Sequence, residues 1–164
     1  KSLKPSIKIL MIKINVIVKD KSWFKFIKNP EIYLKRKIKK IQTDKFFGKK
    51  NYQFSLLLSE AKEIKYLNKK FRKKNKSTDV LSFPFQTKNE LKKKLKSGKE
   101  IYLGDIIINL NKVKDKDILE KFKKEFDRLW IHGLLHLFGY VHKRNEDFLK
   151  MNRIEKKYFN LINV

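Results

Sequence analysis

Four segments of the chain have the hydrophobic pattern of β-strands, and they cover residues 12–18, 52–58, 80–85 and 101–109. In the first segment apolar residues alternate with Lys13 and Asn15, which is the period of two expected of a strand with one solvated face. The last segment is almost continuously apolar and is typical of a buried strand. Pro84 cannot donate a ladder hydrogen bond, so we expect the third strand at a sheet edge or beside a bulge.

Helical spacing of apolar residues predicts four helices. Asn29 is the expected N-cap of the first, and Ser59 is the expected N-cap of the second. A long helix begins near Asp115 and becomes apolar on all sides toward its end, which indicates burial. A final amphipathic helix carries its apolar stripe from Met151 to Leu161.

The order of these elements is β-α-β-α-β-β-α-α, with residues 88–100 expected as a lysine-rich, solvated connection. It predicts an α/β protein of the α+β type, in which a small mixed sheet of about four strands is covered by helices. We expect residues 1–164 to form a single domain, with residues 1–10 as a possible N-terminal extension because Met11 directly precedes the first strand.

Composition excludes several classes of protein. The chain is 41% hydrophobic and 13% aromatic, which is too much core material for a disordered polypeptide. It contains no cysteine, so disulfide scaffolds, thiolate metal sites and cysteine nucleophiles are excluded, and any metal must bind to His, Asp or Glu. No apolar run approaches the ~20 residues of a membrane span. We therefore expect a cytoplasmic protein without a membrane partner.

The chain is strongly basic, with 43 Lys and Arg residues against 17 Asp and Glu residues and a formal charge of +26. A surface this positive favours polyanions, with nucleic acid the first candidate. However, nearly all of the basic residues are lysines and Ala61 is the single alanine, which is the composition of proteins from AT-rich genomes. Such genomes can place additional lysines on solvated faces at little cost to stability. The net charge alone therefore supports an RNA partner only weakly.

The three histidines of the chain, His132, His136 and His142, fall within one window of eleven residues. The first two are four residues apart on the predicted long helix, so they project from the same face at a spacing suited to one metal ion. Gly139 ends the helix and lets the chain bring His142 back as a third ligand. This arrangement predicts a tetrahedral zinc site, one ion per chain, whose fourth position stays open for chemistry.

Two observations bear on this site. On a helical wheel His132 and His136 share the apolar face, so we expect them to point inward, where a metal would satisfy both imidazoles; the alternative is a set of ordinary buried histidines. Gly133 stands where zinc proteases of the H-E-x-x-H type carry their general base. Peptide hydrolysis by that mechanism is therefore disfavoured.

The sequence HGLLHLFGYVH from His132 to His142 resembles the YbeY family of bacterial endoribonucleases and rRNA maturation factors, as do three further segments: Phe71-Arg72, TDVLSFPF at residues 78–85, and LGD at residues 103–105. The resemblance implies a zinc-dependent, single-strand-specific endoribonuclease. It implies a role in ribosome biogenesis at the 3′ end of the small-subunit 16S rRNA, with single-stranded rRNA precursor and the small subunit as partners and no DNA.

The resemblance also implies roles for individual residues. His132, His136 and His142 match the family's zinc ligands, and Arg72 matches an arginine implicated in RNA handling, so His132 and Arg72 are our candidate catalytic residues. Most basic residues of the chain are lysines, so an arginine at this position suggests that bidentate hydrogen bonding of a planar guanidinium to a phosphate is needed here. The chain departs from the family at Val141, where an Asp is usual, and this change removes a potential acceptor for a ligand ring.

The chain departs from the family at two more positions, Arg128 in place of a further His and Ser77 in place of Pro. Asp79 and Asp105 flank strands, where turn or bulge chemistry is the ordinary interpretation and a supporting role at the metal is the alternative. Phe83 and Phe85 are expected in the core rather than as platforms for bases. Two other functions stay open: a non-catalytic ribosome assembly factor with a structural zinc, and a zinc hydrolase of a small substrate.

Overall fold

The computed structural model describes residues 11–48 and 50–164. A four-stranded sheet has the order β1-β2-β4-β3. Strands β1, β2 and β4 run parallel, and β3 pairs with β4 in the antiparallel sense. The strands are β1 (Ile12–Val18), β2 (Tyr52–Ser59), β3 (Val80–Pro84) and β4 (Ile101–Asn109). The sheet is therefore mixed, as predicted, and Pro84 lies on an edge strand, where its missing donor is tolerated.

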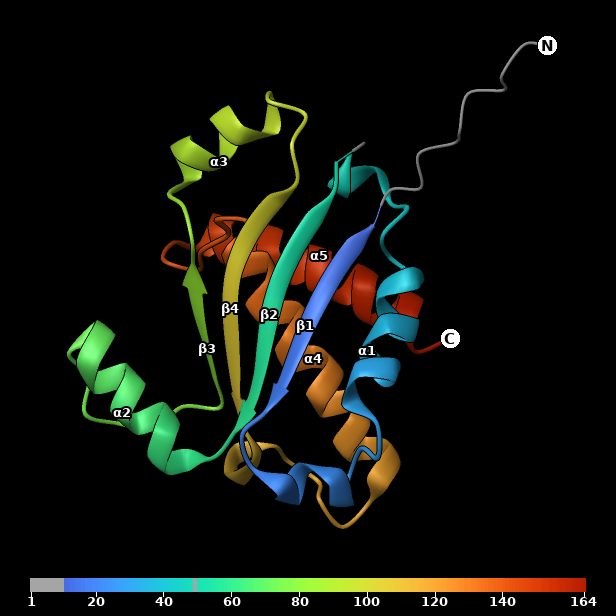
Figure 1. The fold of residues 1–164 in the computed structure, drawn as a ribbon, viewed down its shortest axis with the longest axis vertical. Helices are drawn as coiled ribbons and strands as arrows, with labels where there is room; N and C mark the ends of the chain where they lie inside the picture. Colours follow the sequence, from blue (N-terminus) through green and yellow to red (C-terminus); the bar gives the residue numbers. More distant parts are fainter. Residues whose placement is uncertain (1–10, 49) are drawn as a thin grey trace.

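Three helices cover one face of the sheet, a fourth lies beside β3, and a fifth lies beyond the end of β3 (Figure 1). The covering helices are α1 (Pro30–Lys39), α4 (Leu119–Leu137) and α5 (Asn145–Ile162), and the other two are α2 (Ala61–Arg72) and α3 (Lys88–Leu95). Short 3-10 helices lie at Lys21–Lys25, Lys45–Phe47 and Leu110–Lys112. The predicted fold class is thereby confirmed. Possible extension residues 1–10 lie outside the described residues.

The core is built between the sheet and the covering helices. It contains Trp23, Phe54, Phe122 and Trp130 as fully buried aromatic residues. A second, small cluster of Ile64, Leu81 and Ile107 holds α2 against the other face of the sheet. In the part of the chain that is described, no helix has the length and apolarity needed to cross a bilayer.

Two local predictions were wrong. Residues 88–95 form α3 rather than a loop, because the Thr87 hydroxyl and the Glu90 carboxylate cap each other's backbone amides and start a helix in a lysine-rich segment. The N-cap of α2 is Glu60 rather than Ser59, since the Glu60 carboxylate accepts from the amides of Lys62 and Glu63.

Candidate metal centre

The last two turns of α4 carry His132 and His136, and Gly133 sets how closely this part of the helix approaches the sheet. A Cβ atom at residue 133 would lie 2.7 Å from Cγ2 of Ile106 and 3.1 Å from the Ser82 hydroxyl. The Ser82 hydroxyl also donates to the Gly133 carbonyl at 3.1 Å. A larger side chain here would push α4 away from β3 and β4, so this position faces the sheet and not the histidines.

Gly139 ends the helix and returns the chain toward it. Its φ of +92° lies in the left-handed region that favours glycine. The chain then passes through Tyr140 and Val141 and brings His142 beside the two helical histidines. One ring nitrogen from each of the three imidazoles lies within 4.8 Å of the others, so the three residues could hold a metal ion. Their ring centroids are 4.5 to 5.6 Å apart.

The hydrogen bonds of His132 and His136 fix which nitrogen of each ring carries the proton. Nδ1 of His136 lies 2.8 Å from the Tyr140 carbonyl oxygen, and Nδ1 of His132 contacts the Glu155 carboxylate. Both partners only accept hydrogen bonds, so each Nδ1 must be the donor. In the neutral rings the two Nε2 atoms therefore carry lone pairs.

Those two Nε2 atoms face each other at 3.0 Å. Two lone pairs cannot hydrogen-bond to each other, but both can bind the same cation. Neutral imidazole nitrogens in this orientation, each with its Nδ1–H held by an acceptor, are the donor set that divalent transition metals use in proteins. The residues present therefore fit a metal ion.

Electrostatics keep His136 neutral. Burial and the neighbouring His132 lower the pKa of His136 to about 4, and His142 and Arg72 act in the same direction. A neutral imidazole is the form that binds metal, so this ring is ready for a ligand at pH 7. His132 and His136 are half-buried and His142 is exposed. The prediction that the helical pair points into the core was thus only partly right, because the rings form the wall of a cleft.

The cleft at the three histidines has a volume of about 790 Å³. Its lining comes from the end of α2, from β3 and the start of α3, and from the segment that follows α4. Arg72, the last residue of α2, lines it together with all three histidines. The structure therefore brings together all four residues that the sequence singled out, and it leaves the space beside His142 open.

Arg72 is an exposed residue whose guanidinium is nevertheless anchored at the cleft. One guanidinium nitrogen donates to the Ser82 carbonyl oxygen at 2.7 Å, and the group lies over the Phe83 ring, 5.6 Å from its centroid. Within residues 11–48 and 50–164 this is its one hydrogen bond to protein. Its other N–H donors are available to an anion in the cleft.

The carboxylates near the site have different surroundings. The side chain of Asp79 accepts a hydrogen bond from the Val80 amide at 2.8 Å, as is typical of a turn. Asp79 also lines the cleft together with the three histidines. Asp105 accepts from the Tyr102 hydroxyl and is not part of the cleft lining in the described residues. Glu90 of α3 also lines the cleft, and the sequence interpretation missed it because α3 itself was missed.

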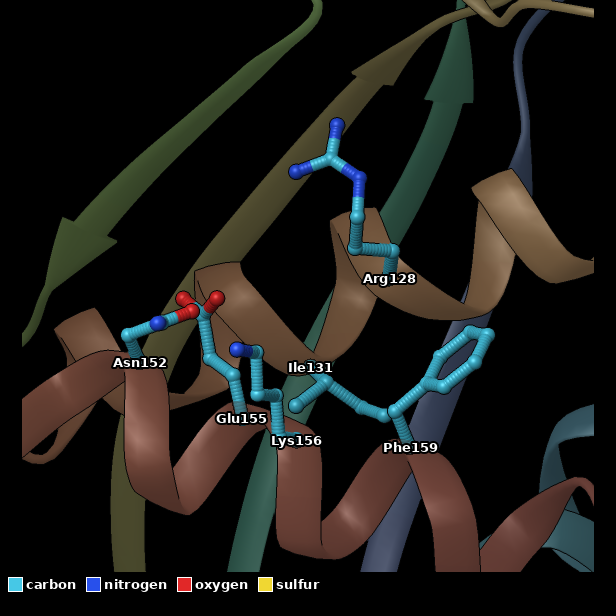
Figure 2. Close-up of a pocket in the computed structure, with 6 residues that line it drawn as sticks. All are labelled: Arg128, Ile131, Asn152, Glu155, Lys156 and Phe159. Atoms are coloured by element: carbon cyan, nitrogen blue, oxygen red, sulfur yellow. The ribbon is translucent and has the colours of Figure 1, made fainter.

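Glu155 is the supporting residue that sequence reasoning did not find. Its side chain rises from α5 toward α4, at one side of a pocket of about 170 Å³ between these helices (Figure 2). It holds His132, while the Tyr140 carbonyl holds His136. Val141 stands where the family usually has Asp. Both helical histidines nevertheless have a hydrogen-bond acceptor in Glu155 and the Tyr140 carbonyl.

The fold thus brings three imidazoles close enough together to hold a metal ion, in a cleft that leaves part of the space around them open. Comparison with known proteins gives the family. A sequence model of the family described as Endoribonuclease YbeY matches residues 19–163. The chain therefore belongs to the YbeY endoribonuclease family.

Individual relatives agree over nearly the whole chain. Endoribonuclease YbeY of Pelagibacter ubique (strain HTCC1062) is 44% identical over 156 residues, which cover 93% of this chain and 97% of the relative. Endoribonuclease YbeY of Ehrlichia canis (strain Jake) is 32% identical over 156 residues, or 94% of each chain. A solution structure of a Thermotoga maritima protein is similar in fold, with a TM-score of 0.53 and 26% identity over 93% of this chain and 89% of that one.

Proposed function

We propose that this protein is a zinc-dependent, single-strand-specific endoribonuclease. The observation that carries the proposal is the pair of Nε2 lone pairs of His132 and His136, which face each other at 3.0 Å in a cleft that Arg72 also lines. Membership of the endoribonuclease family supports RNA as the substrate. Zinc is proposed because a site of three imidazoles with one open position suits that ion.

Each side chain has a defined task in this proposal. His132, His136 and His142 would hold the metal, which supplies Lewis acidity and a water of lowered pKa. Glu155 and the Tyr140 carbonyl keep the two helical imidazoles in the tautomer and orientation that metal binding requires. Arg72, fixed by Ser82 and Phe83, presents its unused N–H donors to the scissile phosphate and stabilises the charge that develops there.

The substrate that we propose is a single-stranded rRNA precursor, at the 3′ end of the small-subunit 16S rRNA. The net charge of +26 supports affinity for RNA phosphates, and that affinity should fall steeply with salt. Contacts to the 2′-hydroxyl distinguish RNA from DNA, so we expect DNA of the same sequence to be cleaved far more slowly than RNA. The exposed His142 favours catalysis over a purely structural metal, because a structural site would be closed by protein on all sides.

The test uses the full chain purified without chelator. We expect close to one zinc per chain by elemental analysis, and cleavage of a labelled single-stranded RNA that EDTA stops and added zinc restores. His136→Ala should lose both the metal and the cleavage, whereas Arg72→Ala should keep the metal and cleave RNA about 10²-fold more slowly. Full nuclease activity of His136→Ala would overturn the proposal, and RNA binding without any cleavage by the zinc-loaded protein would favour the assembly-factor alternative.

A further inference from the structure

Phe85 is an aromatic residue that the structure leaves uncovered beside the candidate active site. It follows β3 directly and lines the cleft, yet 65% of the residue is exposed to solvent. The sequence interpretation placed it in the core, which is wrong, because the strand ends at Pro84 and Phe85 emerges at its end. This large aromatic ring at the edge of the histidine-lined cleft is available to a group that enters the cleft.

The ring is held in place by its neighbours. The Phe85 amide donates to the Leu103 carbonyl at 2.9 Å, so the backbone is tied to β4. The Tyr102 ring packs edge-on against it, with the two centroids 5.6 Å apart. A fixed aromatic ring loses little conformational entropy when a ligand covers it.

Helix α3 places a positive charge at this ring. Nζ of Lys94 lies over the Phe85 ring, 5.3 Å from its centroid, and Lys88 lines the same cleft, as does Glu90. Arg72 lies on the same cleft wall, over Phe83, the residue two positions before Phe85. An aromatic surface flanked by cations is the combination by which proteins hold single-stranded nucleic acid, because bases stack on the ring while phosphates pair with the charges.

We infer that Phe85 is a stacking platform for one unpaired base of the RNA, next to the phosphate that Arg72 and the histidine cluster receive. This inference rests on the proposed function and extends it to a source of single-strand selectivity. A base in a duplex already stacks on its neighbours, so only an unpaired base can lie on Phe85 without breaking those contacts. Phe85 would contact only the flat face of a base. Purines stack more strongly than pyrimidines and should therefore bind better.

The experiment measures binding and cleavage of labelled oligo(A) and oligo(U) by the zinc-loaded full chain. Phe85→Leu keeps an apolar side chain but removes the ring, and we expect at least about 5-fold weaker binding of oligo(A), a matching rise in KM, and a smaller gap between oligo(A) and oligo(U). Phe85→Trp should restore the affinity. Because the residue is largely exposed, thermal unfolding of both variants should match that of the parent protein.

Phe24→Leu is the matched control. Phe24 is also exposed, at 45%, but it belongs to the 3-10 helix that packs near the start of α4, away from the cleft. If Phe85→Leu binds and cleaves oligo(A) as Phe24→Leu does, the stacking inference is overturned while the proposed function stands. A fall in kcat at unchanged KM and affinity would also overturn it. If the parent protein cleaves no RNA, the proposed function fails first, and that outcome is visible without any Phe85 variant.

Discussion

The carboxylate of Glu155 accepts a hydrogen bond from Nδ1 of His132, and so joins α5 to the candidate metal centre on α4. Both side chains are mostly shielded, with 23% of the His132 side chain and 17% of the Glu155 side chain exposed. Because the carboxylate binds Nδ1, it leaves the Nε2 lone pair directed at His136. The last helix of the chain therefore takes part in the site even though it supplies none of the three imidazoles.

Replacing Glu155 with Gln should weaken zinc binding about 10- to 100-fold, because the amide is a weaker acceptor and no longer makes the imidazole more electron-rich. Competition against a chromogenic chelator measures this directly. Glu146→Gln, at the start of the same helix, is the matched control and should leave the affinity unchanged. Equal zinc affinity in Glu155→Gln and the parent protein would show that the contact does not tune the site.

The low pKa of His136 predicts how the metal-free protein responds to acid. An imidazole in the unfolded chain titrates near 6.5, whereas burial and His132 lower the pKa of His136 to about 4 in the folded protein. Between these two values the unfolded chain binds more protons, so the free energy of unfolding should fall as the pH is lowered through this window. Urea titrations in EDTA from pH 7 to pH 4 measure the slope. His136→Asn should show a shallower slope, and an identical slope would contradict the assignment.

Removal of the Arg72 guanidinium should slow RNA cleavage about 10²-fold, because a donor fixed by Ser82 and Phe83 is lost where phosphate charge develops. Arg72→Lys should recover only a small part of this, since an ammonium cannot both hold the Ser82 carbonyl and present a fork to phosphate. Lys70→Ala, which removes one exposed charge from the same helix, should reduce kcat/KM far less. Steady-state kinetics on one RNA oligomer compares the three variants. Equal losses of kcat/KM in all three would show that Arg72 contributes only its positive charge.

Much of the fold and the centre of the site could be predicted from local sequence signals. Alternation identified β1 and β2, and an almost continuous apolar run identified β4. The four-residue spacing of His132 and His136, followed by Gly139, predicted the convergence of three imidazoles. These features depend on residues close together in the chain. Family-typical motifs added Arg72, whose position beside the histidines depends on the packing of α2 against the sheet.

The remaining features depend on tertiary contacts, or on signals that composition concealed. Glu155 lies 23 residues beyond His132, and only the packing of α5 on α4 brings the two side chains together. Phe85 alternates with Phe83 as a strand residue would, so the pattern did not reveal that the strand stops one residue earlier. For α3 a signal was present, since Thr87 and Glu90 have capping-box spacing, but the surrounding lysines suggested a loop.

Gly133 predicts a direct test of how the fold positions the histidines. Gly133→Ala would place a methyl group 2.7 Å from Cγ2 of Ile106, which should cost about 1–2 kcal/mol of unfolding free energy even after the gain in helix propensity. Urea unfolding measures the loss. In an Ile106→Ala background, where the opposing methyl is absent, the same substitution should cost much less, and a cost that is equal in both backgrounds would show that the contact does not limit the approach of α4. The displacement should also slow RNA cleavage, because His132 and His136 move with the helix while Arg72, bonded to Ser82, stays with β3.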